Sequence, residues 1–179
     1  MEKRMIEMTN IPVLETERLI LRANRLADFE AYARFYTTDR AAYRGGIKTR
    51  TQAFLMFAAE VGHWSLRGYG MWALEERASG AYCGQVGLWN PEGWPAPEVG
   101  WLLMEGFEGR GYALEAALRA RDYAYDVLGW TELASCIYVG NDSSIRLAER
   151  MGALVEARVP REGRPDMLIY RHPGPTAPT

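Results

Sequence analysis

The sequence predicts a single α/β domain of mixed, α+β type. Strand-like and amphipathic helical segments follow one another along the 179 residues, without repeats or a linker that would divide the chain. Between residues 98 and 124, an apolar run leads through a glycine-rich loop into an alanine-rich helical pattern. A chain of this length can bury a full core in one domain. We therefore expect one domain over residues 11–172, with flexible ends at 1–10 and 173–179.

Hydrophobic periodicity and turn residues locate the individual elements. Seven strands are expected, at residues 16–22, 71–75, 82–88, 98–104, 132–139, 153–159 and 167–170. Four helices are expected, at residues 28–38, 49–66, 112–128 and 141–152. In the second of these helices, an apolar face is formed by Phe54, Phe57, Ala58 and Val61.

The composition argues against a nucleic-acid partner, a membrane span and a metal site. A net charge of −2 gives no electrostatic case for a nucleic-acid partner. No apolar run approaches the about 18 residues of a membrane span, and the N-terminus lacks the apolar core of a signal peptide. A cytoplasmic protein without a membrane partner is expected. Cys83 and Cys136 lie in strand-like runs and are interpreted as reduced thiols. With only His63 and His172 in the chain, no metal site is expected.

The loop before the alanine-rich helix predicts an anion site. The first N–H groups of a helix have no partner inside the helix and carry partial positive charge. Gly109 and Gly111 precede them, and glycine allows the backbone to approach a bulky anion closely. This arrangement suits a phosphate or pyrophosphate, although glycines also occur at such junctions only to make the turn. The loop is neither a Walker loop nor a GxGxxG dinucleotide fingerprint.

Three motifs in order resemble the GNAT superfamily of N-acetyltransferases, and most closely its RimJ/RimL-like branch of ribosomal-protein alanine acetyltransferases. Residues 14–22 (LETERLILR) resemble the branch's opening strand, LxTERLxLR. Residues 109–116 (GRGYALEA) resemble its GKGYATEA loop, and Asn141 to Ser144 with Met151-Gly152 resemble its NxxS…GF helix. The resemblance implies a mixed, mostly antiparallel, seven-stranded sheet. That sheet would splay between its two parallel strands, near 98–104 and 132–139, and about four helices would flank it.

The resemblance also implies acetyl-CoA as the cosubstrate and no metal. Its pyrophosphate would lie on the backbone amides of Gly109, Arg110, Gly111, Tyr112 and Ala113. Its pantetheine arm would run along the strand of Trp101, Leu102 and Leu103, paired with the backbone like an added strand. The Asn141 side chain would hold the middle of that arm, a role compatible with its position as a helix N-cap.

The chain departs from the family pattern at three positions. Glu108 replaces the glutamine or arginine that usually opens the loop, Leu114 replaces a threonine, and Ala153 replaces a phenylalanine. Arg146 and Arg150 share one helix face and either meet the CoA phosphates or face solvent.

Acetyl transfer to an amine requires a base, an oxyanion donor and a proton for the departing thiolate, because an amine of pKa about 10.4 is mostly protonated at neutral pH. By resemblance, Glu98 is the candidate base, directly or through water, and Ser144 is the candidate acid. Each has a plainer interpretation, Glu98 as a solvated strand-end residue and Ser144 as a first-turn helix residue. The family's usual tyrosine is missing between Ile145 and Ala153.

The expected reaction is direct attack of a primary amine on the thioester in a ternary complex. The acceptor, a protein N-terminus or a small amine, is left open, and so is a homodimer. A catalytically weak or inactive CoA-binding sensor of the same fold is the alternative, supported by the departures at Glu108 and Leu114 and by the missing tyrosine. A P-loop-like nucleotide binder is disfavoured because the loop has no Gly-Lys-Ser/Thr sequence.

Overall fold

The computed structural model describes residues 10–175 and contains one mixed sheet of eight strands. The strand order is β1-β2-β3-β4-β5-β6-β8-β7, and every neighbouring pair except β5 and β6 is antiparallel. The strands are β1 Leu14–Glu15, β2 Leu19–Arg22, β3 Met71–Glu76, β4 Tyr82–Trp89, β5 Glu98–Leu103, β6 Ala134–Tyr138, β7 Leu154–Val159 and β8 Met167–Arg171. The predicted α/β class with a mostly antiparallel sheet is confirmed. The ends predicted to be flexible lie largely outside the described residues.

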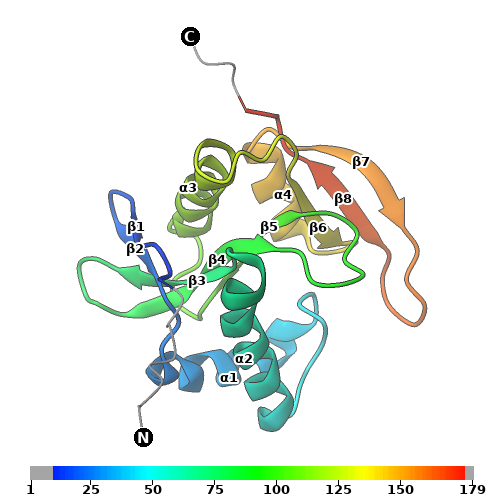
Figure 1. Cartoon of the computed structure of the whole chain (residues 1–179). Helices are drawn as coiled ribbons and strands as arrows, with labels where there is room; N and C mark the ends of the chain where they lie inside the picture. The colour runs from blue at the N-terminus through cyan, green and yellow to red at the C-terminus, as the bar shows by residue number, and fades with distance from the viewer. Residues whose placement is uncertain (1–9, 176–179) are drawn as a thin grey trace, which may run out of the picture.

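Four α-helices within residues 10–175 cover the two faces of the sheet. Figure 1 shows α1 and α2 on one face and α3 and α4 on the other. The helices are α1 Phe29–Tyr36, α2 Arg50–Arg67, α3 Tyr112–Asp126 and α4 Asp142–Arg150, and two short 3-10 helices, η1 Leu26–Asp28 and η2 Asp39–Ala41, flank α1. A capping box between Thr49 and Gln52 begins α2, and Gly68, with φ of +77°, ends it.

The sheet opens between β5 and β6. Only Glu98 and Ala134 are in register there, and the Ala134 N–H donates to the Pro97 carbonyl at 2.9 Å. Beyond this point the Ser135 hydroxyl donates to the Val99 carbonyl at 2.7 Å, so a side chain takes the place of a ladder bond. Because no later residues of the two strands pair, the strands diverge towards their carboxyl ends. The predicted splay is therefore present.

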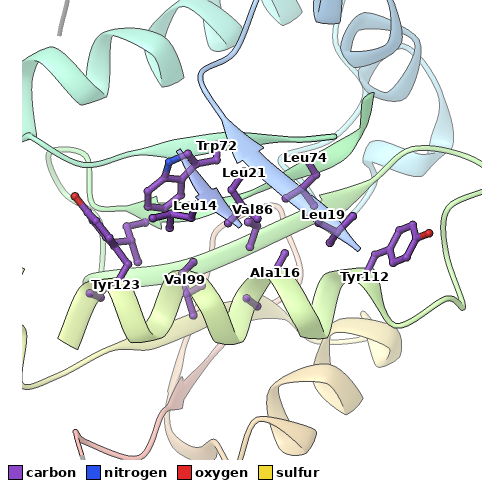
Figure 2. Close-up of a cluster of buried hydrophobic side chains, with 14 of the residues drawn as sticks. Leu14, Leu19, Leu21, Trp72, Leu74, Val86, Val99, Tyr112, Ala116 and Tyr123 are labelled. Carbon is purple, nitrogen blue, oxygen red and sulfur yellow. The ribbon is translucent and has the colours of Figure 1, made fainter. Parts of the chain in front are cut away.

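The alanine face of α3 lets this helix pack closely on the sheet. Ala116, Ala117, Ala120 and Ala124 are fully buried, and Figure 2 shows α3 against the apolar side chains of the strands, with Trp72 and Val99 among them. Small side chains allow a short distance between helix and strands at native packing density. α3, and the loop that precedes it, are therefore held firmly against the sheet.

The first strand is predicted at residues 16–22, but its first three residues form a turn and an additional short strand, β1, precedes them, so the sheet has eight strands rather than seven. The Thr16 N–H donates to the Leu19 carbonyl at 3.0 Å, and the Leu19 N–H donates to the Thr16 hydroxyl at 3.0 Å. The chain thus turns back at residues 16–18, and β1 pairs with β2. β1 has only two residues, too few to show a periodic pattern, so periodicity alone finds β2 and not β1.

The buried face of α2 differs from the predicted one. Phe57 is buried, but Phe54 and Val61 are 45% and 39% exposed, and Ala58 is exposed as well. The buried face consists of Ala53, Phe57, Glu60, His63 and Trp64. Two of these five side chains are polar, and a pattern that counts only apolar residues cannot find them.

Candidate active site

Three cavities with shared walls lie at the opening between β5 and β6. The loop-side cavity, of about 460 Å³, lies between the glycine loop of residues 109–111 and the start of α4. The hairpin-side cavity, of about 290 Å³, lies between α2, the loop before β5 and the turn of β7 and β8. A neck of about 30 Å³ lies at the opening itself. Tyr43 and Arg44 line all three.

The first turn of α3 faces the loop-side cavity without a side-chain cap. Gly111 is its N-cap with φ of +82°, and Gly109 has φ of +73°, a backbone region that favours glycine. By contrast, Thr49 caps α2 and Asn141 caps α4 with side-chain oxygens. The N–H groups at the start of α3 are therefore left for an external acceptor, and such a helix start suits a phosphate.

A carboxylate in the first turn of α3 is turned away from that cavity. Glu115 accepts hydrogen bonds from the Thr16 hydroxyl at 2.6 Å and from Arg18 Nε at 2.7 Å. Burial raises its pKa, but the hydrogen bonds from Thr16 and Arg18 outweigh burial and hold that pKa below its usual value. Arg18 also donates to the Arg110 carbonyl at 2.8 Å and lies over the Tyr112 ring. The opening TER motif therefore fixes the glycine loop.

The predicted CoA-contacting loop residues divide into two groups. Gly109, Gly111, Tyr112 and Ala113 line the loop-side cavity. The Arg110 side chain does not, because it pairs with Glu76 at 3.1 Å.

Glu108 also lines the loop-side cavity, with its charge compensated. Its carboxylate is ion-paired with Arg40 and accepts the Gly106 N–H at 3.0 Å. Burial raises its pKa, but the Arg40 hydrogen bond outweighs burial and holds that pKa below its usual value. Leu114 and Arg150 line the same cavity, whereas Arg146 is exposed and does not.

The edge of β5 that faces the opening has an unpaired backbone segment. Trp101, Leu102 and Leu103 line the loop-side cavity. Alternate residues of a strand direct their backbone groups to the same side. The carbonyl groups of Pro97 and Val99 point towards β6. The backbone groups of Trp101 therefore point the same way, but β6 has diverged from β5 at this position. The Trp101 N–H and C=O are therefore available to an added extended chain.

The start of α4 places two predicted residues beside β5. Asn141 Oδ1 accepts the Ser144 N–H at 3.3 Å and the Ser143 hydroxyl at 3.1 Å, so Asn141 is an N-cap. The Asn141 amide NH₂ has no partner among the described residues. The Ser144 hydroxyl accepts a hydrogen bond from Trp101 Nε1 at 3.2 Å, which leaves its own proton available for donation.

The two predicted catalytic residues come together at the neck. Glu98 and Ser144 both line it, with Trp101 and Asn141. Glu98 is 4% exposed, and its Oε2 accepts the Cys136 N–H at 2.9 Å across the splay. Burial raises the pKa of Glu98, against the opposing effects of the Arg44 charge and of the hydrogen bond from Cys136. Glu98 is thus a buried carboxylate and not a solvated strand-end residue.

Sequence reasoning did not single out Tyr43 and Arg44, which line the neck, or Glu60, which lines the adjoining hairpin-side cavity. Arg44 lies beside Gly100, where an added Cβ would be 3.5 Å from Arg44 Nη1, and its charge acts on both Glu98 and Glu60. Tyr43 packs its hydroxyl against Gly140. Glu60 is 3% exposed and accepts the Tyr32 hydroxyl at 3.0 Å.

Burial raises the pKa of Glu60 to about 7, although Arg44 and Tyr32 oppose this shift. The sequence feature that could have indicated Glu60 is an acidic side chain within the otherwise largely apolar segment of α2. Tyr43 and Arg44 lie in an irregular segment without periodicity.

The two histidines have packing roles, and of the two cysteines only Cys136 lines the neck. His63 Nδ1 lies 2.7 Å from the Tyr69 carbonyl, and His172 Nε2 lies 2.9 Å from the Ser135 hydroxyl. Cys83 and Cys136 are free thiols. Residues 10–175 contain no cluster of three His, Cys, Asp or Glu side chains placed to hold a metal ion. No helix in this part of the chain has the length and apolar character needed to cross a membrane.

Comparison with known proteins identifies the family. The profile of the acetyltransferase (GNAT) domain matches residues 18–154. YkkB of Bacillus subtilis strain 168 is 30% identical over 144 residues, which cover 76% of this chain and 81% of YkkB. The crystal structure of an acetyltransferase from Agrobacterium tumefaciens C58 has a TM-score of 0.84 and 37% identity, and the match covers 91% of this chain and 95% of that chain.

RimL, a ribosomal L7/L12 alpha-N-protein acetyltransferase in complex with coenzyme A, has a TM-score of 0.70 at 18% identity over 90% of this chain and 97% of that chain. At this identity the likeness shows the fold alone. The structure has a glycine loop at an uncapped helix start, beside a sheet that opens between its two parallel strands. The sequence of the same chain matches one family over most of its length. This protein belongs to the GNAT acetyltransferase domain family.

Proposed function

We propose that this protein transfers the acetyl group of acetyl-CoA to a primary amine by direct attack within a ternary complex. One observation carries the proposal. Two cavities lie on either side of a neck that holds Glu98 and Ser144. A donor and an acceptor that enter from opposite sides would therefore meet between a buried carboxylate and a hydroxyl.

The loop-side cavity is the proposed donor site. The backbone amides of residues 109–113 would bind the pyrophosphate, since the start of α3 lacks a cap. The pantetheine arm would lie along Trp101, Leu102 and Leu103, where the strand edge is open, and the Asn141 amide would donate to it. The pairing of Glu108 with Arg40 supports binding, because it removes the uncompensated carboxylate that the sequence placed beside the phosphates.

The proposed chemistry uses the residues of the neck. Glu98 accepts a proton from the acceptor ammonium, directly or through water, and its burial raises its pKa towards the range useful for a base. The neutral amine attacks the thioester carbon, and backbone N–H groups of the Trp101 to Leu103 edge stabilise the oxyanion. The oxyanion then collapses, the C–S bond breaks, and Ser144 donates its proton to the departing thiolate. The nitrogen of the intermediate loses its second proton, which returns to Ser144 directly or through water. The amide product and CoA leave.

Thiol release from acetyl-CoA, measured with a panel of amines and N-terminal peptides, tests this function. We expect amine-dependent release together with a thermal shift caused by CoA. Binding of CoA without release across a broad panel would instead favour the inactive sensor. Thermal stabilisation by ATP and not by CoA would contradict the family-based donor assignment.

A further inference from the structure

We infer that the acceptor is a small primary amine that carries a negatively charged group, a carboxylate or a phosphonate-type oxyanion, at the end opposite the amine. This inference rests on the proposed function, because it takes the hairpin-side cavity as the acceptor site. It goes further by naming the chemical class of the acceptor from the side chains that line this cavity.

The hairpin-side cavity is positively charged, unlike the protein as a whole. Its lining contains four cationic side chains and two carboxylates, whereas the chain carries a net charge of −2. The cations are Arg44, Lys48, Arg161 and Arg164, and the carboxylates are Glu60 and Glu98. Clefts that concentrate one sign of charge attract ligands of the opposite sign. A simple cationic amine is a poor match for such a lining.

The cations at the outer part of this cavity have no carboxylate partner. Within residues 10–175, no ion pair involves Lys48, Arg161 or Arg164. On the same hairpin, by contrast, Arg158 pairs with Asp166 at 2.6 Å and Arg171 pairs with Glu156 at 2.7 Å. The hairpin therefore compensates its cations away from the cavity and leaves those at the cavity uncompensated.

Lys48 and Arg164 are close enough to influence each other. Burial, and then the positive charge of Arg164, lower the pKa of Lys48. The Lys48 ammonium donates to the Gly45 carbonyl at 3.1 Å, which holds it in place without neutralising it. Two like charges held together are unfavourable, and an oxyanion between them would relieve the repulsion. The pair thus forms a site for an anionic group.

The carboxylates lie where the amine must arrive. Glu98 lines both the neck and the hairpin-side cavity, and Glu60 is buried on α2 beside the same space. The rest of the lining is largely apolar and aromatic, with Trp89, Trp94 and Met167 among its residues. The cavity therefore complements a molecule with an ammonium end, a short apolar middle and an anionic end.

The size of the cavity favours a small molecule over a polypeptide. A volume of about 290 Å³ lies at the lower end of the usual range for ligand pockets. The segment at residues 43–48, the loop before β5 and the turn between β7 and β8 wall it, and Figure 1 shows that loop and that turn on the same side of the molecule. An acidic peptide N-terminus is the competing acceptor.

Matched amines test the inference directly. We would compare kcat/KM for 5-aminopentanoate and 4-aminobutylphosphonate with kcat/KM for pentylamine and 1,5-diaminopentane, which differ in the charge of the far end. We expect both anionic amines to exceed pentylamine by about tenfold or more, the effect of one charge-assisted hydrogen bond. The diamine should be the poorest, and added salt should weaken the preference.

Variants assign the preference to the proposed residues. Arg164→Gln and Lys48→Gln should each reduce the ratio of kcat/KM for 5-aminopentanoate to that for pentylamine by about tenfold, through KM rather than kcat. Arg34→Gln removes an exposed cation outside the cavity and should leave the ratio intact. Lys48→Glu should reverse the preference in favour of the diamine.

The outcomes separate this inference from the proposed function. Equal kcat/KM for pentylamine and the anionic amines would overturn the inference while leaving amine acetylation in place. Higher kcat/KM for a peptide with an acidic second residue than for every small amine would also overturn it, in favour of a polypeptide acceptor. CoA binding without transfer to any amine would overturn the proposed function itself.

Discussion

Replacing Glu60 by glutamine should raise the free energy of unfolding, relative to the wild type, by more at neutral and alkaline pH than in acid. Burial raises the pKa of this carboxyl from 4.5 to about 7. The folded state therefore keeps the proton over a pH range in which the unfolded state has lost it. The stability that this group contributes is fully present below pH 4.5 and is lost as the pH rises to about 7.

The magnitude follows from the size of the shift. At about 1.36 kcal/mol per pKa unit, a shift from 4.5 to about 7 corresponds to about 3 kcal/mol. Glutamine keeps the shape and an acceptor for the Tyr32 hydroxyl, but it does not ionise. The free energy of unfolding of Glu60→Gln, minus that of the wild type, should therefore rise by about 3 kcal/mol across this window.

Urea unfolding of both proteins at a series of pH values measures this difference. Glu30→Gln is the matched control, because Arg50 holds the pKa of the exposed Glu30 below its usual value. The control difference should change in the opposite direction with pH. A difference for Glu60→Gln that stays flat between pH 4.5 and about 7 would show that folding does not raise the pKa of this carboxyl, and the reasoning would be refuted.

Three further predictions concern the site and its support. Glu98→Gln keeps an acceptor for the Cys136 N–H, so the splay should be preserved, but it removes the base. It should therefore lower kcat by about 10²-fold or more and flatten the acid limb of the pH–rate profile. Unchanged turnover would exclude Glu98 as the base. Arg18→Gln should raise KM for acetyl-CoA by up to about tenfold with little change in kcat, since its bond to the Arg110 carbonyl holds the loop; a change in kcat alone would contradict this.

Burial lowers the pKa of His172 from 6.5 to about 4, so this residue contributes about 3 kcal/mol of stability that is lost as the pH falls through that window. In urea unfolding, His172→Gln should lack this loss, and a variant that keeps the wild-type acid dependence would refute it.

Much of the fold could be predicted because most elements carry their own local pattern. The alanine face of α3 repeats at helical spacing, and all its members except Ala113 are fully buried. Ala113 is half-buried because it lines the loop-side cavity. The break between β1 and β2 could not be predicted, because Glu115, about 100 residues away, holds the turn at Thr16 and Arg18.

The candidate site was predictable only where it is built on regular elements. Glu98 and Ser144 lie at the starts of β5 and α4, where motif spacing places them. Tyr43 and Arg44 reach the neck from an irregular segment, and tertiary packing alone decides their direction. Glu60 occupies the interior face of α2, where an apolar pattern places no carboxylate. The compensation of Glu108 by Arg40 also depends on a contact between residues distant in sequence.

The missing cap on α3 implies that the apo protein has an incomplete helix start which a bound cosubstrate would finish. A ligand that binds only the folded state adds RT ln(1 + [L]/Kd) to stability, about 2.7 kcal/mol at a hundredfold excess over Kd. Backbone amides at residues 112–114 should then exchange with solvent much more slowly when CoA is present. Resistance of this protein to unfolding and proteolysis would thus follow the level of its cosubstrate.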